Sequence, residues 1–186
     1  LSDIPETEMF NKDRNILVSK FASSAAHVKG TRLVASESCT WINEHFNATL
    51  EEVKVFLDRL FLSGVNHMYY HGCCYSPADA AWPGWCFYAS LEMNPRNPIW
   101  RDAPILNAWI TRVQSLAQTS VPDEDALIYW TLHDYWRNQP ELTYGLSVAG
   151  KEWFAKTAIG ATARRLYAEG AAFDFISDRQ LAALAK

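Results

Sequence analysis

The stretch "RLVASESCTWINEHF", residues 32–46, predicts a buried strand that ends on an acid. Leu33, Val34 and Ala35 follow one another without a polar residue, as in a strand that lies inside a core. Glu37 then stands among two serines and a cysteine. An apolar strand with this ending suggests either that the strand leads into a site, or that the acid pairs with the next helix or with an arginine.

Helical periodicity is found on both sides of this strand. Residues 13–29 predict one helix, and Gly30 follows where a C-cap glycine is common. Residues 50–61 predict a second, strongly amphipathic helix, which Asn47 or Thr49 can cap.

A further strand is predicted over residues 65–72, so the order is helix, strand, helix, strand. The connections are short, which predicts right-handed parallel crossovers and an α/β fold. Residues 72–100 interrupt this order with four prolines, and their aromatic content favours an ordered, functional loop. A helix that Asp102 can cap is predicted over residues 101–118.

The last third of the chain predicts the start of a second α/β unit. The segment VPDED, residues 121–125, is typical of a boundary. The elements predicted beyond it are a buried strand at 126–130, a helix through 164–169, a strand at 173–177 and a short helix from Asp178.

Composition excludes several classes of protein. With 186 residues, 49% of them hydrophobic and 13% aromatic, the chain can bury a sizeable core in one or two globular units. A net charge of −4, with acids and bases interspersed, provides no basic field, so neither nucleic acid nor a membrane surface is expected as a partner. No apolar run reaches the roughly 18 residues of a membrane span, and the first ten residues do not resemble a signal peptide.

The four cysteines, at positions 39, 73, 74 and 86, do not follow a zinc-ribbon spacing. Cys73 and Cys74 are adjacent, and adjacent cysteines rarely reach disulfide geometry. We therefore expect unpaired and mostly buried thiols.

Three predicted strand ends carry polar side chains, at residues 3–8, 36–41 and 66–72. In parallel α/β folds the ligand lies beyond the carboxyl ends of the strands, because the strand-to-helix loops gather there. Glu37 and His71 are therefore expected on neighbouring strands near one pocket floor.

Several of these polar residues also have a purely structural explanation. His67 is more often a hydrogen-bonded core histidine than a catalytic one, and residues 44–45 lie on a loop where a structural role is common. Glu6 and Glu8 could be ordinary surface acids. The segment WPGW, residues 82–85, suits either a loop core or a rigid wall for a sugar ring.

The segments DIPETE, SSAAHVKG, ASESCTWINEHF, GVNHMYYHG, YSP and WPGWCFYA, in this order and spacing, resemble the C-terminal half of the catalytic barrel of glycoside hydrolase family 106, the α-L-rhamnosidases. The likeness continues through NPRNPIW and ALIYW to FDFISDRQL. It implies a (β/α)8 barrel whose C-terminal part is residues 1–120, followed by the start of a second α/β domain in residues 121–186. It also implies inversion at the anomeric carbon, a calcium-assisted site for rhamnose and a periplasmic or extracellular location.

The resemblance also implies roles for individual residues. Glu37 matches the catalytic base by position, and Glu6 is a candidate for contact with the metal or the sugar. Expected substrate contacts are His71, His67, Tyr70 and Trp85. An inverting glycosidase needs a second carboxyl group about 6.5 to 9.5 Å from the first, and the family places that acid on an earlier strand.

A full barrel takes about 250 residues, whereas three barrel strands can be counted before residue 121. We therefore expect a fragment that is inactive alone. Its unpaired sheet edges would associate with the missing N-terminal part of the enzyme or with a second copy.

Two other functions are compatible with the sequence. The first is a non-catalytic carbohydrate-binding module, with Trp82, Trp85 and Tyr88 as stacking walls. The second is a metal-dependent hydrolase with His67, His71 and Glu37 as ligands, although these residues lack a typical ligand spacing.

Overall fold

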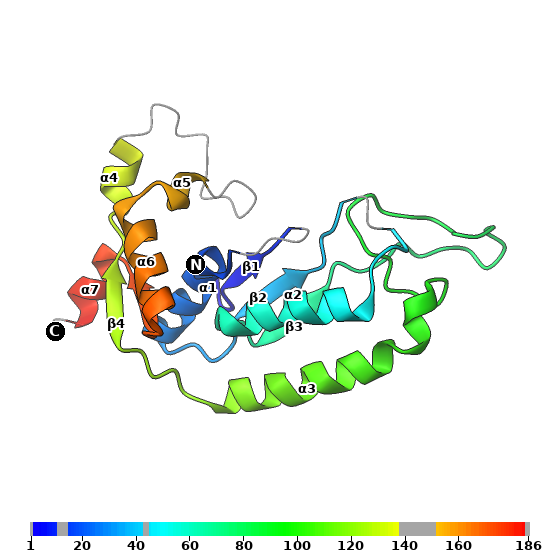
Figure 1. Ribbon diagram of the computed structural model, residues 1–186, viewed down its shortest axis with the longest axis horizontal. Coiled ribbons are helices and arrows are strands. Elements are labelled where there is room, and N and C mark those ends of the chain that lie inside the picture. Colours follow the sequence, from blue (N-terminus) through cyan, green and yellow to red (C-terminus); the bar gives the residue numbers. More distant parts are fainter. Residues whose placement is uncertain (1, 11–14, 43–44, 138–151, 185–186) are drawn as a thin grey trace.

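The structure is a computed structural model that describes residues 2–10, 15–42, 45–137 and 152–184 (Figure 1). Its elements in chain order are β1 (Glu6–Glu8), α1 (Ile16–Lys29), β2 (Ala35–Ser38), α2 (Leu50–Leu62), β3 (His67–Tyr70), the 3-10 helix η1 (Pro98–Arg101), α3 (Ala103–Thr119), β4 (Ala126–Tyr129), α4 (Leu132–Arg137), α5 (Glu152–Ala155), α6 (Ala158–Glu169), β5 (Phe173–Ile176) and α7 (Asp178–Leu184). The predicted α/β class is confirmed, since helices alternate with strands in parallel sheets.

The first sheet has the order β1–β2–β3, and all of its strands run parallel. Its register pairs Glu8 with Glu37, and Glu37 with Tyr69. Paired residues of a parallel sheet point to the same face, so these three side chains lie together. The strand predicted from residue 32 begins later, at Ala35.

Local signals in the sequence determine the ends of α1 and α2. Thr49, one of the two predicted caps, forms a capping box with Glu52 at the start of α2. Gly30 ends α1 with φ of 76°, in the left-handed conformation that a C-cap glycine supplies. The predicted start of α1 falls on residues 13–14, which lie outside the described part of the chain.

Helix α1 is buried on more than one side. The Thr7 hydroxyl of β1 donates to Ser19 (3.1 Å), and the Ser23 hydroxyl donates to the Ser63 carbonyl after α2 (2.6 Å). The Ser24 hydroxyl accepts from the backbone N–H of Phe175 in β5 (2.9 Å). Because neighbouring elements cover α1 on several sides, its serines are buried, and their hydroxyls form hydrogen bonds with those elements.

An aromatic cluster joins α1 to the second sheet, in which β4 and β5 run parallel. Phe21 stacks on Phe175 with ring centroids 4.0 Å apart, and it contacts Phe154 edge-on at 5.7 Å. All four residues of β5 are buried, whereas β4 alternates. The prediction of a buried strand at residues 126–130 is therefore confirmed only for Ile128 and Trp130, because one face of β4 packs on the core.

The predicted ordered loop between β3 and η1 is confirmed. The Arg96 guanidinium donates to the carbonyls of Pro77 (3.2 Å) and Ala80 (2.8 Å), and the Ser76 hydroxyl accepts from the Trp85 N–H (2.9 Å). These bonds hold the backbone, and the loop projects away from the end of the molecule that carries β4 and α7 (Figure 1).

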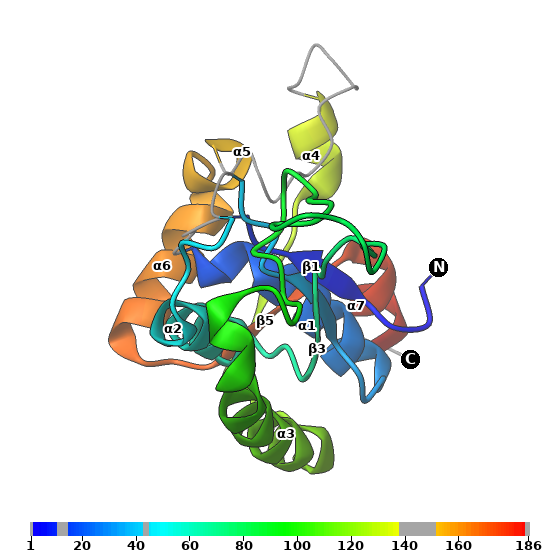
Figure 2. The same cartoon turned by 90° about the vertical axis from the view of Figure 1, so that its right-hand side faces the viewer.

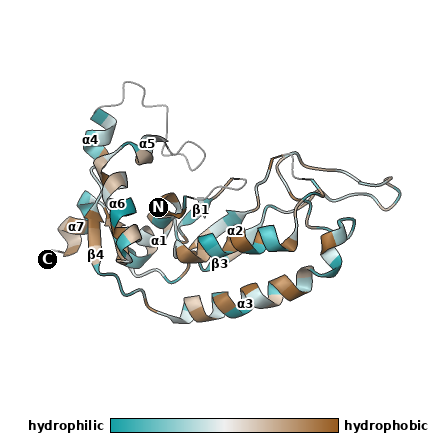
Figure 3. Cartoon of the chain, in the orientation of Figure 1, coloured by the Kyte–Doolittle hydropathy of each residue, from teal (hydrophilic) through white to brown (hydrophobic). Residues whose placement is uncertain are grey.

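Helix α3 packs on α2 at the outside of the molecule (Figure 2). The Trp109 ring lies edge-on to Phe61, with centroids 5.6 Å apart, and Lys54 Nζ lies 4.2 Å from its centroid. Hydrophobic and hydrophilic residues alternate along α3 (Figure 3). The predicted side-chain cap is wrong, because the Asp102 carboxylate pairs with Arg101 (3.2 Å) instead of bonding to the helix.

All four cysteines are free thiols, as predicted. Cys39 is buried, but Cys73 and Cys86 are exposed, so the expectation of mostly buried thiols is wrong. The reason is that both lie on the projecting loop after β3. Among the described residues, no helix combines the length and the apolar character needed to cross a membrane.

Candidate functional site

The carboxyl ends of β1, β2 and β3 bring Glu8, Glu37 and His71 together. Glu8 and Glu37 are paired in register on adjacent strands. His71 Nδ1 lies 3.7 Å from Glu37 Oε1, and both side chains are about one-third exposed. The sequence predicts that Glu37 and His71 meet, and the structure has them in contact; their chemical roles stay predictions.

The environment of Glu8 favours its protonated form. Burial raises the pKa of the Glu8 carboxyl most strongly, and both the negative charge of Glu37 and a hydrogen bond with Glu37 raise it further. A hydrogen bond with Thr40 and the proximity of His71 act in the opposite direction. Two carboxyl groups this close favour either a shared proton or a cation between them.

A tight turn after β2 brings the hydroxyl of Thr40 close to the Glu37 carboxylate. Cys39 is fully buried and has φ of 69°, a conformation that turns the chain sharply. The Thr40 hydroxyl then lies 3.4 Å from Glu37 Oε1. Burial raises the pKa of the Cys39 thiol well above its usual range, so this cysteine is a packing residue and not a nucleophile.

Glu6 lies on the same face as Glu8 but lower on the sheet, opposite Ala35. It hydrogen-bonds with the hydroxyl of Tyr69, whose pKa is raised by burial and by the neighbouring carboxylates. The structure therefore brings Glu8 to Glu37, and Glu6 to Tyr69. The sequence analysis names Glu6 as the candidate for contact with the metal or the sugar and does not indicate that Glu8 lies beside Glu37, because the bounds of β1 depend on its pairing with β2.

His71 is oriented by an aromatic contact and a backbone bond. Its ring lies edge-on to Phe87, with centroids 5.1 Å apart, and its backbone N–H donates to the Ser38 carbonyl (2.7 Å). His71 Nδ1 is buried and has no hydrogen-bond partner among the described residues. A buried polar atom without a partner is rare in a folded protein.

The structure does not bring the other predicted substrate contacts to Glu37. His67 is exposed at the start of β3, so its interpretation as a core histidine is wrong. Tyr70 points to the opposite face, where its hydroxyl donates to Asn107 on α3 (2.9 Å). Trp85 is 62% exposed on the projecting loop.

The segment predicted to be structural at residues 44–45 is partly described. Glu44 lies outside the described residues. His45 Nε2 lies 2.6 Å from the Phe87 carbonyl and so ties the turn before α2 to the loop that also contacts His71.

A second polar cluster, which the sequence does not reveal, lies where α1 meets β5. It contains His27, Glu124 and Asp174. Burial raises the pKa of the Glu124 carboxyl, whereas the charges of Lys20 and His27 act in the opposite direction. His27 and Glu124 also line a cavity of about 750 Å³ beside the segments that precede β2 and β3, at the opposite end of the strands from Glu37.

Comparisons with known proteins place most of the chain in one family. Residues 2–134 match the model of the glycoside hydrolase family Glyco_hydro_106, described as α-L-rhamnosidase. A curated protein of Formosa agariphila, named "Putative beta-glucuronidase", is 32% identical over 114 residues, which are 59% of this chain and 9% of that protein.

A solved structure, that of a rhamnosidase from Novosphingobium sp. PP1Y, has the same fold. Its TM-score is 0.65 at 21% identity, and the match covers 97% of this chain and 16% of that one. The chain thus spans a small part of the length of both relatives.

Proposed function

Because the chain belongs to the glycoside hydrolase family described as α-L-rhamnosidase, we propose that it carries part of the catalytic site of an inverting enzyme that releases terminal rhamnose from plant or microbial glycans. The observation that carries this proposal is the meeting of Glu8, Glu37 and His71 at three neighbouring strand ends. Ligands of parallel α/β enzymes bind at this edge of the sheet.

We propose that residues 1–120 are the C-terminal part of a (β/α)8 barrel and that residues 121–186 begin a second α/β domain. Three parallel strands linked by helices support the first part. In the described chain the outer edges of β1 and β3 are unpaired, so they are available to the rest of the barrel in the full-length protein or to a second copy.

Glu37 is the proposed general base that activates water. Its carboxylate is held by the Thr40 hydroxyl and lies beside His71. Glu8 does not suit the role of catalytic acid, because it hydrogen-bonds with Glu37, whereas an inverting pair needs about 6.5 to 9.5 Å for the water. The acid is therefore proposed to lie outside this chain, which would leave the fragment inactive alone.

His71 is the proposed sugar-binding histidine. Its side chain is 30% exposed beside Glu37, so a sugar hydroxyl can reach the ring, and losing one hydrogen bond to a sugar typically costs about 1 to 3 kcal/mol. His71→Ala in the full-length protein is therefore expected to weaken rhamnose binding by roughly 5- to 150-fold, as measured by calorimetric titration.

His67→Ala is the matched comparison, since His67 is on the same strand but lies four residues closer to its amino end. Its exposed side chain should contribute little to stability, and its removal should change the affinity less than His71→Ala does. Equal affinities in wild type and His71→Ala would place the sugar elsewhere.

We further propose a calcium ion near the same carboxylates. Glu6, Glu8 and Glu37 offer hard oxygen ligands on one face of the sheet. Glu37 places negative charge beside Glu8, and a bound cation would offset it. When bound, calcium would supply that charge and attract the hydroxyls of the sugar.

Chelation with EDTA is expected to lower the activity of the full-length protein, and added calcium should restore it. Glu8→Gln should lower the calcium content found by elemental analysis. Unchanged activity after chelation, with no calcium bound by the wild-type protein, would remove the ion from the proposal.

The exposed aromatic loop supports a second candidate, a non-catalytic carbohydrate-binding module. Trp82, Trp85 and Tyr88 are 69%, 62% and 65% exposed on a backbone that is held by hydrogen bonds. Rings presented in this way can stack on sugars, and Trp85 is the proposed stacking contact in either function. A site for carbohydrate agrees with the periplasmic or extracellular location that we propose for the protein.

The substrate assay that tests the proposal compares two aryl glycosides. The full-length protein is expected to hydrolyse an aryl α-L-rhamnoside and to leave an aryl β-D-glucuronide intact. Hydrolysis of the glucuronide alone would move the assignment toward the activity in the name of the Formosa agariphila relative. Binding of rhamnosides without hydrolysis of either compound would favour the binding module.

A further inference from the structure

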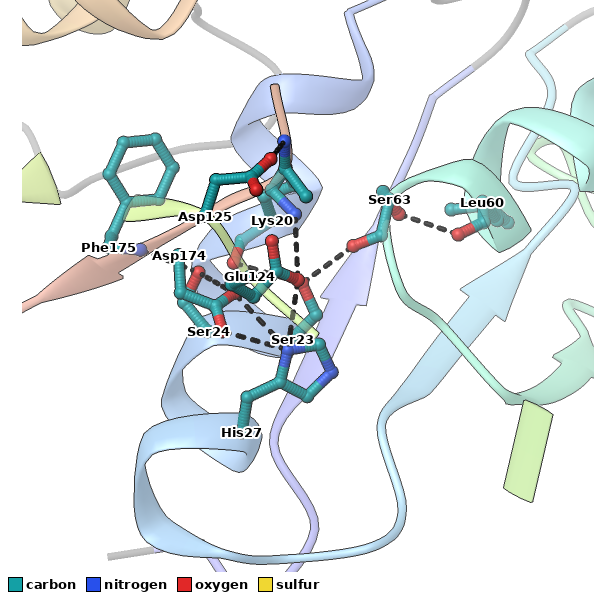
Figure 4. Close-up of polar contacts among 11 residues, drawn as sticks. Lys20, Ser23, Ser24, His27, Leu60, Ser63, Glu124, Asp125, Asp174 and Phe175 are labelled. Carbon is teal, nitrogen blue, oxygen red and sulfur yellow. Dashed lines mark hydrogen bonds and ion pairs between the residues drawn. The ribbon is translucent and has the colours of Figure 1, made fainter. Parts of the chain in front are cut away.

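Three segments that are distant in sequence converge on one point between α1 and β5 (Figure 4). His27 comes from the last turn of α1, Glu124 from the connection between α3 and β4, and Asp174 from β5. One ligand atom from each lies within 4.8 Å of the other two. His27 Nδ1 lies 3.0 Å from Asp174 Oδ2 and 3.8 Å from Glu124 Oε1.

Asp174 is buried and Glu124 is partly buried, with a side chain that is 18% exposed, and both carboxylates have few donors. The Asp174 side chain is 3% exposed, and its contacts are the Ser24 hydroxyl (2.9 Å) and His27. Glu124 Oε2 is fully buried and has no hydrogen-bond partner among the described residues. A buried carboxylate oxygen without a donor is costly, so its presence points to a cationic ligand.

Lys20 compensates this charge only in part. Its Nζ lies 4.0 Å from Glu124 Oε1, beyond hydrogen-bond distance, and 5.1 Å from the ring centroid of Phe173. The cluster thus sets two carboxylates against one lysine and one imidazole.

We propose that His27, Glu124 and Asp174 bind a divalent transition metal, and that Zn²⁺ suits this donor set best. Imidazole and carboxylate are both common zinc ligands, whereas calcium prefers oxygen ligands alone. Neighbouring ligand atoms of a tetrahedral zinc ion lie about 3.4 Å apart, and the two distances from His27 Nδ1 lie on either side of this value.

The surroundings of the cluster agree with such a site. His27 Nδ1 is hydrogen-bonded with the Asp174 carboxylate (3.0 Å). A bound metal would replace this hydrogen bond, with the ring proton on Nε2, and Figure 4 shows the second ring nitrogen pointing away from both carboxylates. The Ser24 hydroxyl donates to Asp174 and accepts from the Phe175 N–H, which fixes the orientation of the carboxylate. The cavity of about 750 Å³ beside His27 and Glu124 offers the ion a path of entry.

The consequence is structural. A metal held by three segments would join both β5 and the connection before β4 to α1. This junction lies at the end of the strands opposite Glu37. Binding to the folded state alone stabilises a protein, so the ion would raise the melting temperature.

The test is a titration of the metal-free full-length protein with Co²⁺, which absorbs visible light in a tetrahedral site, and with Zn²⁺, followed by melting curves. One equivalent is expected to bind in the wild-type protein, with a rise in melting temperature on adding Zn²⁺. Asp174→Asn and His27→Gln should each weaken binding by more than about 100-fold, and Ser24→Ala by about 10- to 100-fold.

His133→Gln is the matched control, because His133 forms an exposed pair with Asp178 (3.5 Å) outside the cluster. This variant should bind the metal as tightly as the wild-type protein does. If Asp174→Asn does not fold, His27→Gln and Glu124→Gln decide the question. The proposal is overturned if the wild-type protein binds no stoichiometric metal. It is also overturned if all variants bind alike, since a site outside this cluster would then hold the ion.

Discussion

Replacing Glu37 with Gln in the full-length protein is expected to lower turnover of an aryl α-L-rhamnoside by at least about 100-fold. The amide keeps the shape of the side chain and can still contact the Thr40 hydroxyl, but it cannot take a proton from water. KM should change little, because the lost interaction develops in the transition state. Steady-state kinetics of the two proteins give both constants.

Glu51→Gln serves as the control for this substitution. Glu51 is an exposed acid in the first turn of α2, so its removal changes the same charge without touching the strand ends. If Glu37→Gln and Glu51→Gln have the same turnover, Glu37 takes no part in the chemistry.

Phe175→Ala is expected to lower the free energy of unfolding of the chain by about 3 to 5 kcal/mol, as for other buried aromatic residues. Phe175 is 3% exposed, and its ring stacks on Phe21 of α1 and contacts Phe154 of α5. The substitution would remove ring contacts that join three elements and leave a cavity at their centre. Chemical denaturation followed by tryptophan fluorescence measures the change.

Leu181→Ala on α7 is the comparison. This substitution also removes a large apolar side chain, but Leu181 is 47% exposed. It should cost well under half of the energy that Phe175→Ala costs. Similar losses in the two variants would mean that the aromatic cluster does not hold β5 against α1.

Local sequence patterns predict much of the fold. Capping at Thr49 and the left-handed Gly30 depend on residues within one or two turns, and both are found in the structure. The stacking of Phe21 on Phe175 joins residues far apart in the chain, and no local pattern indicates it. The broad burial of α1 follows from that contact, so a single apolar stripe underestimates it.

The site could be predicted to the same extent. Strand ends and alternation place Glu37 beside His71, as the structure does. Because successive side chains of a strand point to opposite faces, Tyr70 and His71 are expected on different faces of the sheet. In the structure the Tyr70 hydroxyl forms a hydrogen bond with Asn107 of α3. The choice between Glu6 and Glu8 required the register of β1 against β2, which only the paired strands define.

The cluster of His27 and Asp174 marks the limit of sequence reasoning. The two residues are separated by 147 positions, and neither belongs to a motif with recognisable ligand spacing. Their proximity results from the packing of β5 on α1, which the three-dimensional structure alone reveals.

The central claim is that Glu37, at the strand ends, supports hydrolysis of rhamnosides with inversion. It is tested most directly by proton NMR of the anomeric signals while the full-length protein hydrolyses an aryl α-L-rhamnoside. With the wild-type protein we expect β-L-rhamnose to appear first and the α anomer to follow by mutarotation. With Glu37→Gln we expect both anomers to form far more slowly than with the wild-type protein. Initial release of α-L-rhamnose, or the same initial rate with Glu37→Gln, would contradict the claim.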